Sequence, residues 1–423
     1  MRTTRPLSRM RRALLGATTL FLLGGLVASA QPAPPGEVVA AGLDHPRGLT
    51  ADGDDVLIAE LGAGRVLRLA PDGSTSVLAT GLPTTVFFNA ASGSDEPGGP
   101  SAVVPVAGGY AVAVSEADTG AFQSVYYVQA DGTQVRIADL GAYEAEHNTD
   151  GDTTPDGDPE LLSNPYSIVT DGAGGLYVAD SGANAVLHIS ADGTVSPFAV
   201  FPDRENPLFP DFGPPTMDQV PTGMVAGPDG ALYVTTLTGF PFPQGGAVVY
   251  RLSDDDGNGD ALGDGEMTVF ASGLTAATDL AFDVDGSLLV TQFTADMLAE
   301  NVPGQVVRVR DGDVQVVVDG LITPTNLVVT ASGRVLVSQA FAGLVSDVTD
   351  LVRATPEDGS EGAPADDTED SGATPESGTP APAASGHGAL IASGGSMSAV
   401  WLALAVAVGL VALRGVVSRS ERA

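Results

Sequence analysis

Residues 220–234 read VPTGMVAGPDGALYV, and this stretch contains the unit from which the fold can be predicted. An apolar run begins at Val220, the turn Asp229-Gly230 follows, and a second apolar run begins at Leu232. Asp-Gly supplies the positive φ that a tight β-hairpin needs. Both runs are short and show no helical period, which favours strands. The stretch therefore predicts a β-hairpin with a buried second strand.

The same unit recurs along the chain. Each turn with glycine is followed by an apolar strand, VLIAE, LYVAD, LYVTT, LLVTQ or VLVSQ, and these turns are Asp52-Gly53, Asp171-Gly172, Asp229-Gly230, Asp285-Gly286 and Ser332-Gly333. A third and a fourth strand complete each unit. Four short strands at a period of about 40 to 60 residues are typical of a β-propeller blade. We predict an all-β, six-bladed propeller over residues 36–353. The degenerate second unit, residues 83–140, leaves five or seven blades open.

The first and last strands predict how the ring closes. The sixth unit, residues 323–352, shows no convincing outer strand, whereas residues 37–41 (EVVAA) read as an outer strand without a unit of its own. Pairing the two would complete the sixth blade and remove an open sheet edge.

The two ends of the chain predict export and membrane attachment. Residues 1–30 have a basic start, an apolar run and small residues before a cleavage point after Ala30, as in a signal peptide. The route, general or twin-arginine, stays open. Residues 389–413 are long and apolar enough for a transmembrane helix, and the basic tail, residues 414–423, favours the cytoplasmic side. Residues 354–388, rich in Pro, Gly, Ser, Thr and acids, predict a disordered stalk. We expect a single-pass protein of the cell membrane with its propeller outside.

Composition excludes several kinds of chemistry. The formal net charge is −35, which argues against nucleic-acid binding. The chain has no cysteine and all its bases are arginine, so disulfides, Schiff-base chemistry and a P-loop lysine are excluded. No nucleophile elbow or zinc-protease motif occurs among the residues. We therefore expect a protein without catalytic residues.

The long insertions predict which face binds a partner. They join second to third strands or one blade to the next, so they share one face of the propeller. Second strands end and first strands begin there, near the channel. The candidate ligand residues at this mouth are Glu60, Glu116, Asp180, Asp279 and Asn326, with Phe240 and Phe242 in an aromatic-Pro loop above. A ring of polar strand ends needs no ligand, and the aromatic loops could equally cover the blade tops. The partner would be a small molecule or a protein.

Two acidic loops have oxygen ligands at spacings that suit calcium. Asp254, Asp256, Asn258 and Asp260 occupy alternate positions with a glycine at the bend, like the first half of an EF-hand loop. The twelfth position is Gly265, and Glu266 lies one residue late. We expect this loop between third and fourth strands, opposite the insertions. A second acidic loop contains Asp150, Asp152, Asp156, Asp158 and Glu160. Solvated acidic loops without an ion remain the alternative.

Five motifs carry a resemblance to a known family. They are HPRGL (45–49), NPYSI (164–168), ADSGAN (179–184), VPTGMVAGPDGALYV (220–234) and LTGFPFP (237–243). On these, residues 36–350 resemble the ScyD/ScyE family of NHL-like propellers. The resemblance implies a secreted six-bladed propeller and no settled activity.

Three hypotheses of function follow. The first is a non-catalytic binding propeller at the cell envelope. The second is a metal-dependent hydrolase or lactonase of the SMP-30/gluconolactonase type. Asp279 and Asn326 loosely resemble the metal ligands of that family. The third is a structural envelope protein.

Overall fold

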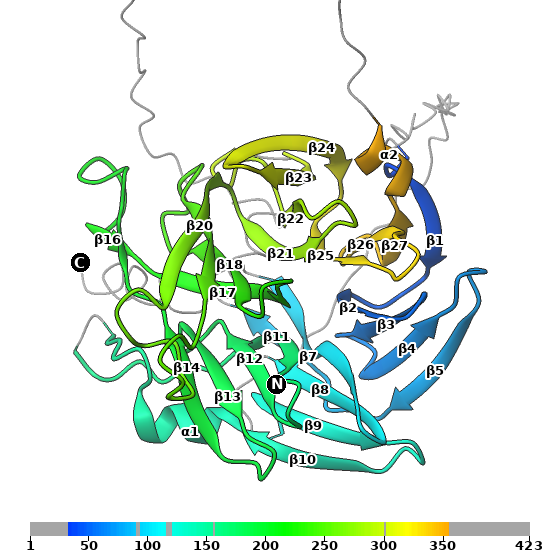
Figure 1. Ribbon diagram of the computed structural model, residues 1–423, viewed down its shortest axis with the longest axis horizontal. Helices are drawn as coiled ribbons and strands as arrows, with labels where there is room; N and C mark the ends of the chain where they lie inside the picture. Colours follow the sequence, from blue (N-terminus) through cyan, green and yellow to red (C-terminus); the bar gives the residue numbers. More distant parts are fainter. Residues whose placement is uncertain (1–32, 90–93, 116–120, 155–156, 300–301, 355–423) are drawn as a thin grey trace, which may run out of the picture. The chain divides into compact units, whose positions relative to one another are not determined.

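Six four-stranded or five-stranded antiparallel sheets form a closed propeller (Figure 1). The computed structural model describes residues 33–89, 94–115, 121–154, 157–299 and 302–354. The predicted signal peptide, stalk, transmembrane helix and cytoplasmic tail lie outside these residues. Within the described ranges, no helix is both long and apolar enough to cross a membrane.

Five of the blades follow the chain in simple order. Blade 1 contains β2 (Pro46–Asp52), β3 (Asp55–Glu60), β4 (Arg65–Leu69) and β5 (Thr75–Thr80). Blade 2 contains β6 (Thr85–Asn89), β7 (Ser94–Val106), β8 (Gly109–Ser115), β9 (Ser124–Gln129) and β10 (Gln134–Asp139). Blade 3 contains β11 (Pro165–Thr170), β12 (Leu176–Asp180), β13 (Ala185–Ile189) and β14 (Val195–Val200). Blade 4 contains β17 (Gln219–Ala226), β18 (Leu232–Thr238), β19 (Ala247–Leu252) and β20 (Met267–Leu274). Blade 5 contains β21 (Ala277–Phe282), β22 (Leu288–Gln292), β23 (Gly304–Arg310) and β24 (Asp313–Leu321).

Blade 6 joins the two ends of the propeller. It contains β25 (Pro324–Val329), β26 (Val335–Gln339) and β27 (Leu344–Asp347), and its outer strand is β1 (Glu37–Ala41). The pairing is antiparallel, with Glu37 opposite Asp347 and Ala41 opposite Leu344. The predicted closure and the count of six blades are therefore confirmed.

The predicted hairpins form because each turn has a residue that tolerates its backbone. Gly230 adopts φ 85° between β17 and β18, as the Asp-Gly motif requires. All seven residues of β18 are buried, since this second strand has a sheet on either side. Val234 faces blade 3 and Tyr233 faces blade 5, because successive side chains of a strand point to opposite faces.

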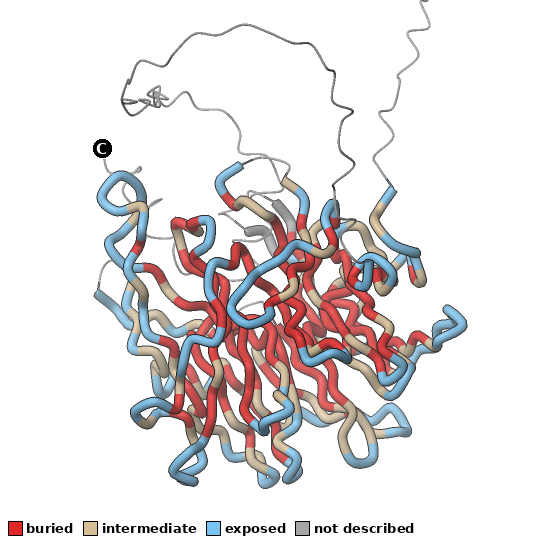
Figure 2. Tube along the Cα trace, turned by 45° about the horizontal axis from the view of Figure 1, so that its top comes forward, coloured by how far each residue is buried: buried red, intermediate tan, exposed pale blue. Residues whose placement is uncertain are grey.

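The core consists of six apolar layers, one between each pair of neighbouring blades in the described chain. Leu57 and Val112 pack between blades 1 and 2, for example, and Leu336 and Ile58 between blades 6 and 1. Figure 2 shows these strands buried and the connecting loops exposed. The fold is thus stabilised by contacts between sheets around a ring, each repeat burying its neighbours' faces.

The first strands close the centre of the ring. Each contacts the next, from β2 through β7, β11, β17, β21 and β25 back to β2. A hydroxyl near the start of several of these strands donates to a backbone carbonyl of the next blade: Ser101 to Pro165 O at 2.6 Å, Thr222 to Ala277 O at 3.1 Å and Thr278 to Pro324 O at 3.4 Å. Gly48 has no room for a Cβ, which would overlap the Ser101 carbonyl.

Two faces of the propeller follow from this topology. We call the face with the loops between blades and between second and third strands the insertion face, and the opposite one the turn face. On the insertion face lie helix α1 (Leu140–His147) and a small hairpin of β15 (Arg204–Glu205) and β16 (Thr216–Met217). The turn face carries the glycine turns and the long loop between β19 and β20.

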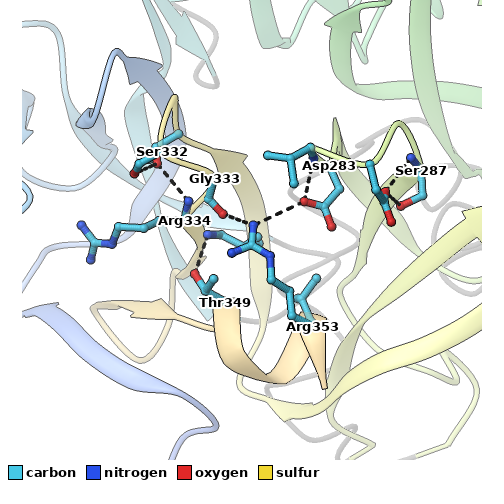
Figure 3. A network of polar contacts seen from close by, with 12 residues as sticks. Asp283, Ser287, Ser332, Gly333, Arg334, Thr349 and Arg353 are labelled. Carbon is cyan, nitrogen blue, oxygen red and sulfur yellow. Dashed lines mark hydrogen bonds and ion pairs between the residues drawn. The ribbon is translucent and has the colours of Figure 1, made fainter. Parts of the chain in front are cut away.

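Helix α2 (Thr349–Arg353) fixes the end of the described chain on the turn face (Figure 3). The Arg353 guanidinium donates to Gly333 O in blade 6 and lies 3.6 Å from the Asp283 carboxylate in blade 5. Val335 N at the start of β26 donates to the Thr349 hydroxyl at 2.8 Å. The described chain therefore ends on the face opposite the insertions.

Candidate functional site

The predicted residues at the ends of second strands each hold the loop that opens their own blade. Glu60 Oε1 accepts from Asp44 N at 2.8 Å, and Asp180 Oδ1 accepts from Asn164 N at 2.6 Å. Gln339 Oε1 accepts from Ile322 N at 2.7 Å in the same way. Glu60 also forms an ion pair with Arg65. These buried contacts account for both carboxylates in structural terms, and a ligand role for them stays a prediction. Glu116 lies outside the described residues.

Asp279 and Asn326 lie on neighbouring first strands and link three blades. Asp279 Oδ2 accepts from Leu327 N in blade 6 at 2.9 Å, and Asn326 Oδ1 accepts from Leu49 N in blade 1 at 3.0 Å. The Asp279 side chain also fills the space beside Gly223, where a Cβ would overlap it. Burial raises the pKa of Asp279 to about 8, so its carboxyl is protonated at neutral pH. Within the described chain, these residues form no group of three acidic or histidine ligands.

The aromatic residues predicted to roof a ligand pack on the propeller and on one another. Phe242 lies against the apolar cluster that contains Leu237 and Phe293, over blades 4 and 5. The Phe240 ring centroid lies 5.2 Å from that of Phe212 and 6.3 Å from that of Phe242. These contacts favour the alternative in which the loop covers the blade tops.

The loop between β19 and β20 can hold a metal ion. Ligand oxygens of Asp254, Asp256 and Glu266 lie within 4.8 Å of one another. Three carboxylates form an oxygen donor set, which suits a hard divalent cation. Glu266 directly precedes β20, and it is buried, with 3% of its surface exposed. Asp254 Oδ2 accepts from Gly259 N at 3.0 Å, which wraps the backbone around the site.

Two further residues predicted for this loop lie outside the group of three. Asp260 Oδ1 accepts from Leu262 N at 3.0 Å. Asn258 Oδ1 accepts from Asp260 N at 2.8 Å, and Asn258 Nδ2 donates to Asp256 Oδ2 at 3.4 Å. The third carboxylate of the group is Glu266, one residue beyond the EF-hand spacing. The loop also contacts blade 3, because Ala261 N donates to Phe198 O at 2.7 Å.

A cavity on the insertion face gathers side chains that the sequence keeps far apart. Its volume is about 350 Å³, and its lining residues, which define the Asp150 pocket, are Asp150, Asp152, Asn184, Val200, Phe201, Pro202 and Asp203. They come from the loop before blade 3, from the turn between β12 and β13, and from the segment after β14. The sequence predicts Asp150 and Asp152 in one acidic loop with Asp156, Asp158 and Glu160, but their partners in the pocket come from the turn between β12 and β13 and from the segment after β14. Asp156 lies outside the described residues.

Helix α1 positions the acidic loop of this pocket. Asp139 caps the helix by accepting from Ala142 N at 2.9 Å, and Asn148 ends it in the left-handed conformation with φ 45°. Both oxygens of the buried Glu144 then accept from Thr149 N at 3.2 Å. These contacts set the direction of the chain as it enters Asp150.

Asn184 connects that loop to blade 3. It occupies a left-handed position with φ 44°, which asparagine tolerates better than most residues. Its backbone carbonyl accepts from Phe201 N at 2.9 Å. Its Nδ2 donates to Asp150 Oδ2 at 3.0 Å and to Asp152 Oδ2 at 3.2 Å. The sequence signal for this residue is the ADSGAN motif, whose final Asn lies at the turn.

Burial raises the pKa values of Asp150 and Asp152 in the pocket and of Asp218 beside it. Burial, followed by the charges of Asp150 and Asp203, raises the pKa of Asp152 to about 6. Burial, with the charges of Asp152 and Asp203, raises the pKa of the neighbouring Asp218 to about 6 as well. Burial also raises the pKa of Asp150. In the described chain, no arginine or histidine forms an ion pair with Asp150, Asp152, Asp203 or Asp218.

Comparison with known proteins places the chain in no family. No model of a known protein family matches it, and no curated protein shows significant similarity to its sequence.

Among solved structures, three distant likenesses to the propeller are representative. Regucalcin, a calcium-binding protein from Agrobacterium tumefaciens, is 15% identical at a TM-score of 0.46, over 75% of this chain and 95% of regucalcin. A candidate gluconolactonase is 14% identical at 0.43, over 75% and 93% of the two chains. A streptogramin B lyase is 13% identical at 0.42, over 74% and 96%. Likenesses this distant assign neither a family nor an activity to this chain.

Proposed function

We propose that this chain is a non-catalytic binding propeller whose insertion face takes up a positively charged ligand in the Asp150 pocket. The observation that carries the proposal is the meeting of Asp150, Asp152 and Asp203 in one cavity, with Asp218 beside them and no basic partner in the described chain. Clustered carboxylates either take up protons or attract a cation, because like charges repel at short range. A bound cation would relieve that repulsion.

The location belongs to the same proposal. A signal peptide at residues 1–30 and a transmembrane helix at residues 389–413 would hold the propeller outside the cell, as a ScyD/ScyE-like protein of the envelope. Because the described chain ends at α2 on the turn face, a stalk starting there would keep that face nearer the membrane. The Asp150 pocket would then face outward, toward small molecules or other proteins.

We assign calcium a structural role in the loop between β19 and β20. The three carboxylates of Asp254, Asp256 and Glu266 would bind the ion on the turn face, away from the Asp150 pocket. The ion would neutralise the three carboxylates and so stabilise the loop in the conformation in which Ala261 N donates to Phe198 O of blade 3. This ion would stabilise the propeller and take no part in ligand binding.

The hydrolase alternative has less support at the axis. Its metal would need oxygens from Asp279 and Asn326, and one oxygen of each side chain already accepts a backbone N–H of the next blade. Metal analysis separates the two functions. A divalent ion that is lost in Asp279→Ala would favour the enzyme, whereas an ion-free axis in a folded protein would favour the binding propeller.

The test of the binding function is a calorimetric titration of the full-length protein at pH 7.5 with spermidine, Ca²⁺ and gluconate. In a protein that carries Asp254→Asn and Asp256→Asn, which disable the loop on the turn face, we expect at least one of the two cations to bind. Adding Asp150→Asn and Asp152→Asn should weaken that binding at least tenfold. A matched control, Asp131→Asn with Asp192→Asn, removes the same charge from exposed turns and should leave binding unchanged. Equal loss in both double variants, or binding of gluconate alone, would contradict the proposal.

A further inference from the structure

We infer that Asp150, Asp152 and Asn184 form a binding site for a divalent metal ion of the calcium class in the Asp150 pocket. This inference rests on the proposed function of the same pocket and names the chemical class of its cation. The site differs from the acidic loop between β19 and β20, which lies on the turn face and uses Asp254, Asp256 and Glu266.

The first observation is the distance between three side chains from two separate loops. Asn184 Nδ2 lies 3.0 Å from Asp150 Oδ2 and 3.2 Å from Asp152 Oδ2. Adjacent oxygens around an ion with Ca–O bonds of about 2.4 Å are separated by about 2.8 to 3.4 Å. The Asn184 amide therefore already lies at the spacing of a neighbouring ligand from each carboxylate.

The second observation concerns the other end of the Asn184 amide. Asn184 is 3% exposed, it lines the cavity, and its Oδ1 is buried without a hydrogen-bond partner. A buried carbonyl oxygen without a donor is unfavourable, because it has lost its hydrogen bonds to water. The Asn184 amide thus donates to both carboxylates while its oxygen has no partner. This is the orientation expected of an amide ligand before the ion binds.

A half-turn of this amide converts the arrangement into a metal site. The nitrogen and oxygen of a carboxamide have nearly the same size and shape, so rotation about the last side-chain bond exchanges them with little other movement. Oδ1 would then lie about as far from the two carboxylate oxygens as Nδ2 does now. Three oxygens facing one another repel unless a cation lies between them, so the ion and the rotation require each other.

The chemistry of the pocket selects the class of ion. Its polar lining consists of carboxylate and amide groups, and neither histidine nor cysteine contributes to it. Oxygen ligands on flexible loops suit Ca²⁺, which accepts six to eight of them in irregular geometry. Asp203 and Asp218 add negative charge without being ligands in this arrangement. The remaining cavity leaves room for water or for an oxygen of a ligand to complete the coordination.

The experiment counts calcium ions by equilibrium dialysis on the full-length protein carrying Asp254→Asn and Asp256→Asn, which disables the loop on the turn face. We expect one ion per chain. Adding Asp150→Asn and Asp152→Asn should abolish it. Asn184→Gly, which keeps the left-handed turn but removes the amide, should lower the affinity at least tenfold, whereas Asn184→Asp, which keeps an oxygen, should retain it. Melting curves check that each variant is folded.

The outcomes separate this inference from the proposed function. No calcium in the folded reference variant, or an ion that survives Asp150→Asn with Asp152→Asn, overturns the inference. So does an affinity that does not change in Asn184→Gly. If calcium is absent but spermidine binds in a manner that depends on Asp150 and Asp152, the metal site fails and the cation-binding function stands. If neither cation binds, both fail.

Discussion

At the scale of single residues, Asp279 has the most altered chemistry in the ring of first strands. Its side chain is 4% exposed and enclosed by blades 4, 5 and 6. Asn326 occupies the equivalent place in the next blade and makes the equivalent contact to Leu49 N. A neutral amide therefore makes the same contact in the next blade that the protonated Asp279 makes here.

We predict that Asp279→Asn removes a pH dependence from the stability of the propeller. The pKa of the buried carboxyl is about 8 in the folded protein, well above its value in an unfolded chain. As pH rises from about 4 to about 8, the unfolded chain releases a proton that the folded one retains, so the wild type loses stability, by up to roughly 5 kcal/mol. Urea unfolding between pH 4.5 and 8.5 should give a flatter profile for the variant. Parallel profiles would show that Asp279 is already ionised.

A second residue-scale prediction concerns the strand-end contacts. Asp180 is fully buried and accepts from the Ser163 hydroxyl at 2.6 Å and from Asn164 N at 2.6 Å. Asp180→Ala leaves these donors unsatisfied, and we expect a loss on the order of 3 kcal/mol in the free energy of unfolding. Asp192→Ala, in an exposed turn, is the control and should change it by less than about 1 kcal/mol. If the two variants were equally stable, the strand-end contact would have no structural role.

At the scale of elements, the acidic loop between β19 and β20 could be predicted in position and only partly in composition. Asp254 and Asp256 follow the EF-hand spacing, so their pairing could be read from the chain. Glu266 lies one residue late, and whether it reaches the site depends on how the backbone turns into β20. Spacing alone does not determine that path.

We predict that calcium stabilises the protein through this loop. An ion at 100 times its dissociation constant adds about 2.7 kcal/mol to the free energy of unfolding for each site on the folded chain. Thermal melts with calcium and with a chelator give the gain in the free energy of unfolding that calcium causes. This gain should be larger by that amount in the wild type than in Asp254→Asn with Asp256→Asn. An equal calcium effect in both proteins would place no ion in this loop.

The Asp150 pocket could not be predicted as a site, for a physical reason at the same scale. Asp150 and Asp203 belong to two insertions whose loops follow no hydrophobic period, and Asn184 lies in the turn between β12 and β13. Their meeting depends on the helix cap at Asp139, the left-handed turn at Asn184 and the ring that brings the loops together. Local pattern predicts strands and tight turns because these are determined by neighbouring residues, whereas loop contacts are determined by the whole fold.

At the scale of the whole molecule, the ring and its closure were predictable because each blade is encoded in its own segment. The Asp-Gly turns and buried second strands repeat, and the spare strand at residues 37–41 matches the missing strand of blade 6. Blade 2 was ambiguous because β8 follows an Ala107-Gly108 turn without an aspartate, and because β6 adds a fifth strand.

We predict that deleting residues 33–41 opens the ring. The outer strand of blade 6 would be lost, β27 would become an exposed edge, and unpaired edges favour association between chains. We expect a loss on the order of 3 kcal/mol in stability and self-association that increases with concentration. Deleting residues 33–36, which leaves β1 intact, is the matched control. Sedimentation and urea unfolding that do not distinguish the two deletions would contradict the role of β1 in closure.

The central claim is that the insertion face binds a cation in the Asp150 pocket. The most direct test is a crystal structure of the protein grown with Mn²⁺, which replaces Ca²⁺ at oxygen sites and gives an anomalous signal. We expect an anomalous peak between Asp150, Asp152 and Asn184, with the Asn184 amide oxygen turned toward it. An ordered pocket without a peak, in a crystal whose Asp254 loop is filled, would contradict it.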